Sequence, residues 1–134
     1  MRALGYKIGL HTGGIYPARL TDVLPQLDWV GLDIKTSAPH YDALTGRRGS
    51  AAPVDACLDL LLQNGGAFEC RTTWHPDWLP EPQLLALAQN LSRRGVKHYA
   101  LQAYRSAPGT PAITLPSEGT QRALAASFSS FCCR

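Results

Sequence analysis

Five polar side chains stand at or near the ends of four short apolar runs, and their types could support chemistry. They are His11, Asp33, Lys35, Thr73 and Tyr104. Used together, the histidine, the aspartate and the lysine could serve a small hydrolase or an aldolase-type lyase, with Lys35 forming a Schiff base if it is desolvated. The sequence contains no nucleophile elbow, HExxH motif or Ser/His/Asp pattern that would support this hypothesis.

Each of these residues also has a plain structural interpretation. Asp33 and Lys35 could form an i,i+2 ion pair on a solvated face, and Glu69 and Arg71 could neutralise each other. His11 could cap the loop that follows it. The set as a whole is harder to explain in this way than any one member.

A glycine pair, Gly13-Gly14, follows the first apolar run and would let a ligand approach the backbone closely. The longer phosphate-loop motifs GxGxxG and GxxxxGK[ST] are absent from the sequence. The glycine pair alone is therefore weak evidence for a binding site.

The four apolar runs have the length and the alternation of β-strands, and helical patterns follow each of them. The predicted strands are 6–12, 29–35, 67–73 and 98–104. The predicted helices begin at Pro17, carry apolar stripes over 54–62 and 84–91, and run through Leu124, Phe128 and Phe131. Residues 1–4 could be the tail of another helix, and the long segment 36–52 is expected to carry a function or a short helix. The order (α)βαβαβαβα predicts an α/β fold with four parallel strands and right-handed crossovers.

The two faces of the predicted strands differ in character. One face is apolar, and the other carries His11, Asp33, Lys35, Glu69, Arg71, Thr73, His98, Gln102 and Tyr104. A parallel strand covered on both faces should be apolar on both, and a buried charge is costly unless it is paired or meets a ligand. The polar face therefore predicts a lined cavity. Its simplest geometry is the inside of an open or closed β/α barrel, with chemistry at the carboxyl ends of the strands.

Composition excludes several classes of protein. The chain has 134 residues, of which 45% are hydrophobic, and a net charge of +3. This size and composition predict one ordered domain, and the charge is too small to imply nucleic acid as a partner. No apolar run reaches the length of a membrane span, and residues 1–6 lack the apolar core of a signal peptide. We therefore expect a cytoplasmic protein with no membrane partner.

The four cysteines do not have the spacing of a metal site or a disulfide framework. Cys57 and Cys70 lie inside apolar patterns and are predicted to be small core residues. Cys132 and Cys133 are predicted to be exposed thiols at a helix end, although such a pair could bind a metal or form a mixed disulfide. We expect no metal site in this chain.

Five segments together resemble the activating enzymes of anaerobic ribonucleoside-triphosphate reductases, which belong to the radical S-adenosylmethionine (SAM) superfamily. The segments are LHTGGIYP at 10–17, WVGLDIK at 29–35, HYDALTG at 40–46, CRTTWHP at 70–76 and YALQAYR at 99–105. Their order and spacing are similar to strands three to six of that family's (β/α)6 barrel. The resemblance covers about residues 1–105 and implies that 1–134 is a single truncated radical SAM β/α domain, in which 106–134 form a loop and a C-terminal helix.

The resemblance implies a chemistry and a partner. In that family a CxxxCxxC loop holds a [4Fe-4S] cluster that cleaves SAM, and the resulting 5′-deoxyadenosyl radical takes a hydrogen atom from a glycine of the partner reductase. The SAM-binding residues that it implies are Thr12, Gly13, Asp33, Lys35 and Arg71. The residues that could line the site are His11, Gly14, His40, Glu69, Thr73, Gln102 and Tyr104. Segment 40–46 would help to receive the glycine loop of the reductase.

The resemblance also implies that the cluster-binding part of the family's domain is missing from this sequence. The CxxxCxxC loop and the Gly-Gly-Glu motif of the family's first two strands have no counterpart here, and the four cysteines are too far apart to replace them. We therefore expect neither a cluster nor SAM cleavage from this chain alone. It could be a truncated reading frame, one half of a split protein completed by an N-terminal chain, or a non-catalytic remnant that only binds a partner. The strand at 6–12 would have an exposed parallel edge.

Overall fold

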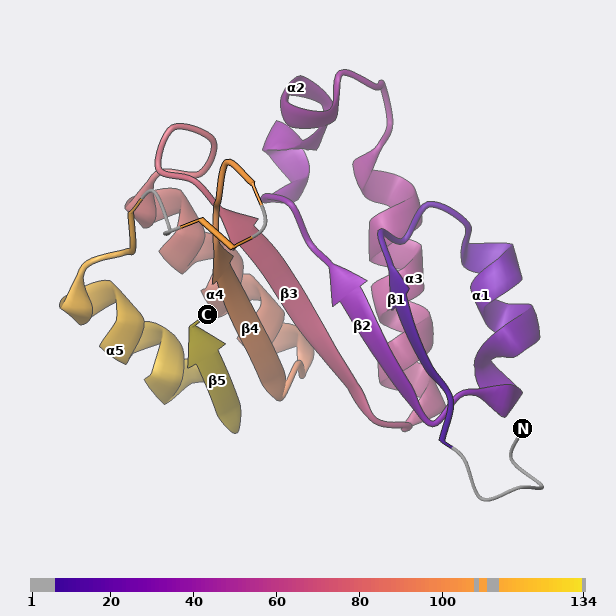
Figure 1. Ribbon diagram of the computed structural model, residues 1–134. Coiled ribbons are helices and arrows are strands. Elements are labelled where there is room, and N and C mark those ends of the chain that lie inside the picture. Colours follow the sequence, from indigo (N-terminus) through magenta and orange to yellow (C-terminus); the bar gives the residue numbers. More distant parts are fainter. Residues whose placement is uncertain (1–6, 108, 111–113, 134) are drawn as a thin grey trace.

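The computed structural model describes residues 7–107, 109–110 and 114–133 (Figure 1). The predicted helix tail at 1–4 and the first residue of the predicted strand 6–12 lie outside the described residues. Within them, no helix combines the length and the apolar character that crossing a membrane would require.

In the described part of the chain, five parallel strands form one sheet in sequential order. They are β1 (Gly9–Thr12), β2 (Trp29–Asp33), β3 (Phe68–Trp74), β4 (His98–Ala103) and β5 (Ser130–Cys133). Each of the first four strands overlaps one of the four predicted strands. The predicted α/β class and the predicted parallel arrangement are therefore confirmed. The fifth strand was not predicted.

The C-terminal segment differs from the prediction, because the expected helix through Phe131 ends earlier. Helix α5 (Glu118–Ser127) stops at Ser127, and the next residue, Phe128, has extended backbone angles. The Ser130 N–H then donates to the Lys97 carbonyl at 3.1 Å, where β5 begins to pair with β4. The open edge of β4 offers a row of backbone hydrogen bonds that a helix in this position would leave unmade. Phe131 therefore packs on the core from a strand, and the sheet has five strands rather than four.

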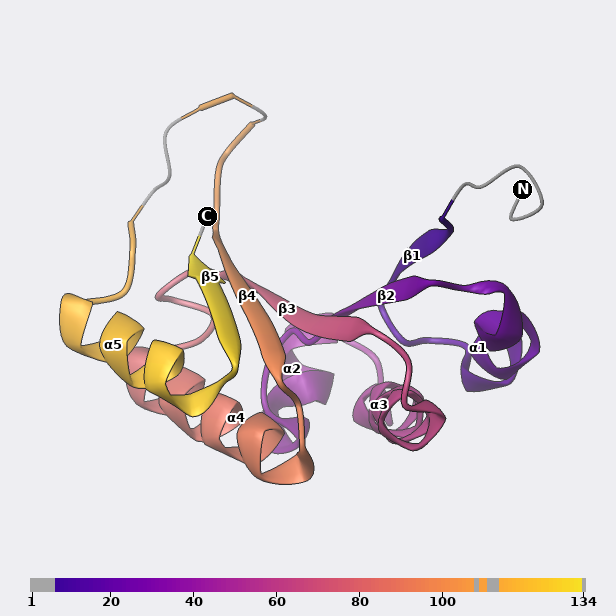
Figure 2. The same ribbon diagram turned by 90° about the horizontal axis from the view of Figure 1, so that it is seen from below.

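The helices lie on one side of the sheet, as Figure 2 shows. They are α1 (Pro17–Val23), followed by the short 3-10 helix η2 (Leu24–Gln26), then α3 (Ala51–Asn64), α4 (Glu81–Arg94) and α5. The long segment 36–52 does contain helical turns, namely η3 (Ala38–His40) and α2 (Tyr41–Thr45). Crossovers of one hand between strands in sequential order place every helix on the same face. The opposite face of the sheet is therefore left without helices in the described part of the chain.

The core lies between the helices and the covered face of the sheet. Alternate strand residues are buried there, including Val30, Leu32, Cys70, Tyr99 and Leu101. The predicted stripes on α3 and α4 face them and contribute Val54, Cys57, Leu58, Leu61, Leu84, Leu87, Ala88 and Leu91. These positions confirm the apolar strand face and the two core cysteines. Helices α3 and α4 end at Gly65 and Gly95, which adopt the left-handed conformation expected of a glycine stop.

Candidate functional site

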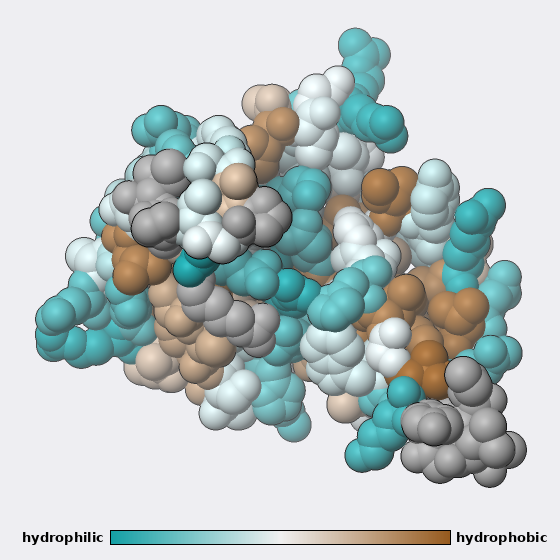
Figure 3. All heavy atoms as spheres, viewed as in Figure 1, coloured by the Kyte–Doolittle hydropathy of each residue, from teal (hydrophilic) through white to brown (hydrophobic). Residues whose placement is uncertain are grey.

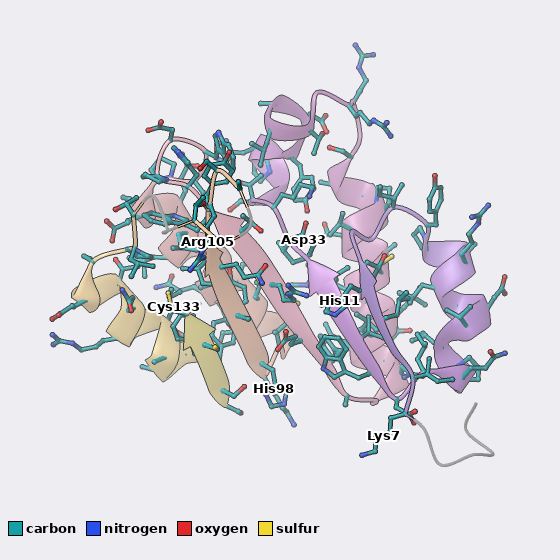
Figure 4. All side chains as sticks on the ribbon, viewed as in Figure 1. Lys7, His11, Asp33, His98, Arg105 and Cys133 are labelled. Carbon is teal, nitrogen blue, oxygen red and sulfur yellow. The ribbon has the colours of Figure 1, made fainter. Side chains whose placement is uncertain are left out.

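The helix-free face carries the polar strand residues. The strand register sets His11 beside Gly31, Asp33 beside Arg71, and Thr73 beside Gln102. These pairs place polar side chains from four adjacent strands side by side near the carboxyl ends. Figure 3 shows hydrophilic residues crossing the middle of this face, and Figure 4 shows His11 and Asp33 on neighbouring strands.

A pocket of about 330 Å³ opens on this face. It is lined by His11, Thr12, Gly13, Gly31, Asp33, Arg71, Thr73 and Gln102. The structure thus brings together four of the five residues that the family resemblance assigns to SAM. The fifth, Lys35, lines an adjacent pocket of about 420 Å³ that shares Asp33 and Thr73 with the first and adds Leu44 and Trp78.

Arg71 is the main positive charge inside the pocket. Its Nη1 contacts the His11 ring at Nδ1, and its Nε lies 3.9 Å from the Glu69 carboxylate. The side chain of Arg71 is only 20% exposed, and its Nε has no hydrogen-bond partner among the described residues. Glu69 therefore balances part of this charge, as the structural interpretation of the sequence expects. A buried N–H without an acceptor is unfavourable, so the guanidinium is suited to an oxygen atom supplied by a ligand.

Asp33 and Lys35 form the i,i+2 ion pair that the sequence allowed, with 2.7 Å between Lys35 Nζ and Asp33 Oδ2. Their side chains are 36% and 47% exposed, and a solvated pair of this kind contributes little to stability. A Schiff-base lysine is activated by desolvation. The half-exposed, paired ammonium of Lys35 lacks that environment, which weighs against a lyase or hydrolase built on it.

Among the described residues, the His11 side chain forms no hydrogen bond with the loop that follows it. The loop is held instead by Thr12, whose Oγ1 accepts a hydrogen bond from Gly14 N at 3.1 Å. The His11 ring packs edge-on against Trp29, with 5.0 Å between the ring centroids. A Cβ atom at Gly31 would lie 2.7 Å from Trp29 Cη2 and 3.0 Å from His11 Nδ1. Glycine at position 31 is therefore what lets the two rings meet over β2.

Buried hydroxyl groups hold the chain where it leaves β2. Tyr41 Oη accepts a hydrogen bond from Lys35 N at 2.9 Å. Thr72 Oγ1 donates to the Ile34 carbonyl at 2.6 Å and accepts from Tyr99 Oη at 2.6 Å. Burial raises the pKa of Tyr41 to about 12 and also raises the pKa of Tyr99, so both phenols remain protonated at neutral pH. These groups position the segment that carries the Asp33–Lys35 pair.

Sequence reasoning did not select these hydroxyl groups. The available signal is Thr72, a polar residue on the strand face where Cys70 and Trp74 are buried. Buried polar groups in native proteins are almost always hydrogen-bonded, so such a residue indicates a specific partner. The identity of that partner depends on the packing of two other strands.

Other predicted site residues lie outside the first pocket. Gly14 has a φ of +73°, and a Cβ atom there would meet Leu32 and Val54, so it faces the core. His40 is exposed at the end of η3. Glu69 lies on the polar face without lining the pocket. Tyr104 follows β4 and belongs to a separate aromatic cluster.

That aromatic cluster also contains a residue that sequence reasoning missed. Trp78 stacks on His75 with 4.7 Å between ring centroids, and Tyr104 meets the indole edge-on at 4.9 Å. Trp78 is 47% exposed and lines the pocket that contains Lys35. Trp78 therefore brings one aromatic side chain to the pocket of the charged pair, and His75 and Tyr104 pack against that side chain.

The four cysteines do not converge. Cys57 and Cys70 are buried on the helix side, whereas Cys132 and Cys133 are successive residues of β5, which point to opposite faces. Burial raises the pKa of Cys70 to about 12, although iron–sulfur ligands must be thiolates. Nowhere in the described residues do three or more His, Cys, Asp or Glu side chains form a group that could hold a metal ion. The cysteines of this chain do not fit a [4Fe-4S] cluster.

No protein-family model matches this chain, and no curated protein matches its sequence.

Proposed function

We propose that this chain is the SAM-binding part of a radical SAM domain of the kind that activates anaerobic ribonucleoside-triphosphate reductase, and that it does not cleave SAM alone. The proposal rests on the sequence resemblance. The order of the sheet supports it, because sequential parallel strands with all helices on one face are what a partial (β/α)6 barrel requires. The pocket at the carboxyl ends of the strands is where such barrels bind their ligands.

The structural observation that best supports the proposal is the largely buried guanidinium of Arg71, whose Nε has no hydrogen-bond partner in the described part of the chain. SAM offers a carboxylate, which pairs well with a guanidinium, and Lys35 could approach the same carboxylate as a point charge. Asp33 would hold the ammonium group or the ribose hydroxyl groups. Gly13 lets the ligand approach the backbone beside them.

In this proposal the cluster is supplied from outside the chain, because its cysteines do not fit one. The outer edge of β1 has no strand paired to it among the described residues. A parallel strand of a complementing N-terminal chain could add there by backbone hydrogen bonds. Such a chain would bring the CxxxCxxC loop next to Thr12 and Gly13.

Binding of the reductase without catalysis is the second candidate function. Exposed apolar side chains that follow the strand ends favour it, namely Ile15, Tyr16 and Trp78. Apolar side chains gathered around a site are typical of a protein interface. A pull-down with the anaerobic reductase tests this function separately from SAM binding, and absence of binding at micromolar concentrations would count against it.

Isothermal titration of the full chain with SAM tests the main proposal. We expect saturable binding that Arg71→Gln and Asp33→Asn each weaken about tenfold, as the loss of one charge-assisted hydrogen bond predicts. Asp22→Asn, on the exposed surface of α1, is the matched control and should bind SAM as the native chain does. A folded chain that shows no binding at millimolar SAM would overturn the proposal.

Anaerobic incubation of the chain with iron, sulfide, reductant and SAM tests the second half of the proposal. We expect no 5′-deoxyadenosine from the chain alone. Formation of 5′-deoxyadenosine by the pure chain would show that it holds a working cluster, and the conclusion drawn from its cysteines would then be wrong.

A further inference from the structure

A second cavity lies on the helix-covered side of the sheet, between α3 and α4. Its volume is about 380 Å³. Its walls include Ile34, Tyr41, Val54, Leu58, Leu87 and Leu91, each at most 5% exposed. Protein interiors leave few voids larger than a water molecule, and ligand pockets begin at about 300 Å³. The cavity is therefore large enough for a small organic molecule.

Thr36 places a polar group beside these apolar walls, and Ser37 and Asn90 are further polar residues of the lining. The residue lines the cavity and is only 2% exposed. Its Oγ1 has no hydrogen-bond partner among the described residues. Native proteins seldom leave a buried hydroxyl group unpaired, so a group that enters the cavity and bonds to Thr36 would satisfy it.

An ion-pair bridge joins the two helices beside the cavity, and two of its members, Asp55 and Arg94, line it. Arg94 of α4 donates from Nη1 to Asp55 at 2.7 Å and from Nη2 to Asp59 at 2.8 Å, and both carboxylates belong to α3. The Arg94 guanidinium is thus already matched by two carboxylates, so it has little to offer an anion. A charged group next to the buried Thr36 would lose its hydration.

We propose that the cavity between α3 and α4 binds a small, uncharged amphipathic molecule. Its aliphatic body would contact Leu58 and Leu87, and its hydroxyl or amide group would form a hydrogen bond with Thr36 Oγ1. Among the described residues, this cavity and the polar pocket on the other face of the sheet share no lining residue. The proposal is therefore independent of SAM binding.

Titration of the full chain with 1-hexanol, followed by NMR of its leucine and valine methyl groups, tests the proposal. We expect saturable shifts of the methyl signals of Leu58 and Leu87, while the backbone amide signals of the polar-pocket residues, recorded on the same samples, stay unchanged. Thr36→Val keeps the shape of the side chain and removes only the hydroxyl group. It should weaken hexanol binding about fivefold, the effect of one neutral hydrogen bond.

Two controls make the test specific. Thr21→Val makes the same chemical change on the exposed surface of α1 and should leave hexanol affinity unchanged. Hexanoate, which has the same chain length and a charged end, should bind at least tenfold more weakly than hexanol. The proposal is overturned if hexanol causes no shifts at Leu58 and Leu87, if Thr36→Val binds it as well as the native chain, or if hexanoate binds equally well.

Discussion

Replacing Thr72 by valine exchanges one buried hydroxyl group for a methyl group of similar size, and that hydroxyl group has two partners. It donates to the Ile34 carbonyl and accepts from the Tyr99 phenol, each at 2.6 Å. Thr72 is 0% exposed and Tyr99 is 1% exposed, so water cannot replace the lost bonds. An orphaned buried polar group costs about 1 to 3 kcal/mol. Thr72→Val leaves both the Ile34 carbonyl and the Tyr99 hydroxyl group without this partner. We therefore expect the free energy of unfolding to fall by about 3 kcal/mol.

A double substitution separates this network from ordinary packing effects. Tyr99→Phe alone leaves Thr72 bonded to Ile34 and should cost about 1 kcal/mol. The double variant has no Tyr99 hydroxyl group, so Thr72→Val leaves only the Ile34 carbonyl unpaired in it. We therefore expect the double variant to lose about 2 kcal/mol of the free energy of unfolding in total. The two changes should therefore be coupled by about 2 kcal/mol, as expected of residues in one hydrogen-bond network.

Equilibrium unfolding in urea, followed by circular dichroism, measures these values. With a slope of about 1.5 kcal/mol per molar urea, Thr72→Val should lower the midpoint by about 2 M. Thr73→Val is the matched control, because the next residue along β3 is exposed on the polar face. The control should change the free energy of unfolding by less than about 0.5 kcal/mol. A Thr72→Val midpoint equal to that of the control, or additive effects in the double variant, would refute the reasoning.

Three further predictions follow from other parts of the structure. Gly31→Ala should push the Trp29 ring out of place and weaken the proposed SAM binding about tenfold. A clash on an open face should lower the free energy of unfolding by only about 1 kcal/mol. A SAM affinity equal to that of the native chain in titration calorimetry would contradict this prediction. The backbone N–H groups of Gly49 and Ser50 donate hydrogen bonds to Asp42 and lower the pKa of its carboxyl group. The Asp42 carboxylate therefore stabilises the fold above about pH 4, and this stabilisation is lost as the pH falls through the lowered pKa. Asp42→Asn should therefore flatten the decline of the urea midpoint between pH 5 and pH 2 or so, and an unchanged decline would argue against it. Maleimide at neutral pH should label the exposed Cys132 within minutes and the buried Cys70 only in denaturant. Peptide mass spectrometry measures the labelling of each cysteine. Rapid labelling of Cys70 in the native chain would contradict the prediction and show that the sheet opens.

Most of the fold could be predicted because its signals are local. Alternation with a period of two separates the buried Val30 and Leu32 from the polar Asp33, and the apolar stripes of α3 and α4 recur at helical spacing. Segment 128–133 could not be assigned in this way. Phe128 and Phe131 are spaced for one face of a helix, but the open edge of β4 recruits the segment as a strand.

The candidate site was predictable in its composition and not in its contacts. His11, Asp33 and Thr73 could be chosen because the carboxyl ends of parallel strands meet at one edge of a sheet, whereas Thr12 and Gly13 were chosen only because of the family resemblance. The contact between Arg71 and His11 joins residues that are 60 positions apart. Such a contact depends on the register of three strands, which no local pattern encodes.

The sequence by itself determined the α/β class, the parallel strands and the polar strand face, because each follows from the order and periodicity of neighbouring residues. Only the tertiary structure decided which polar groups meet. It paired Thr72 with Tyr99, gave the His11 and Trp29 rings the space above Gly31, and left the cavity between α3 and α4. These features arise from distances between elements that are far apart in the chain, and packing and strand register set those distances.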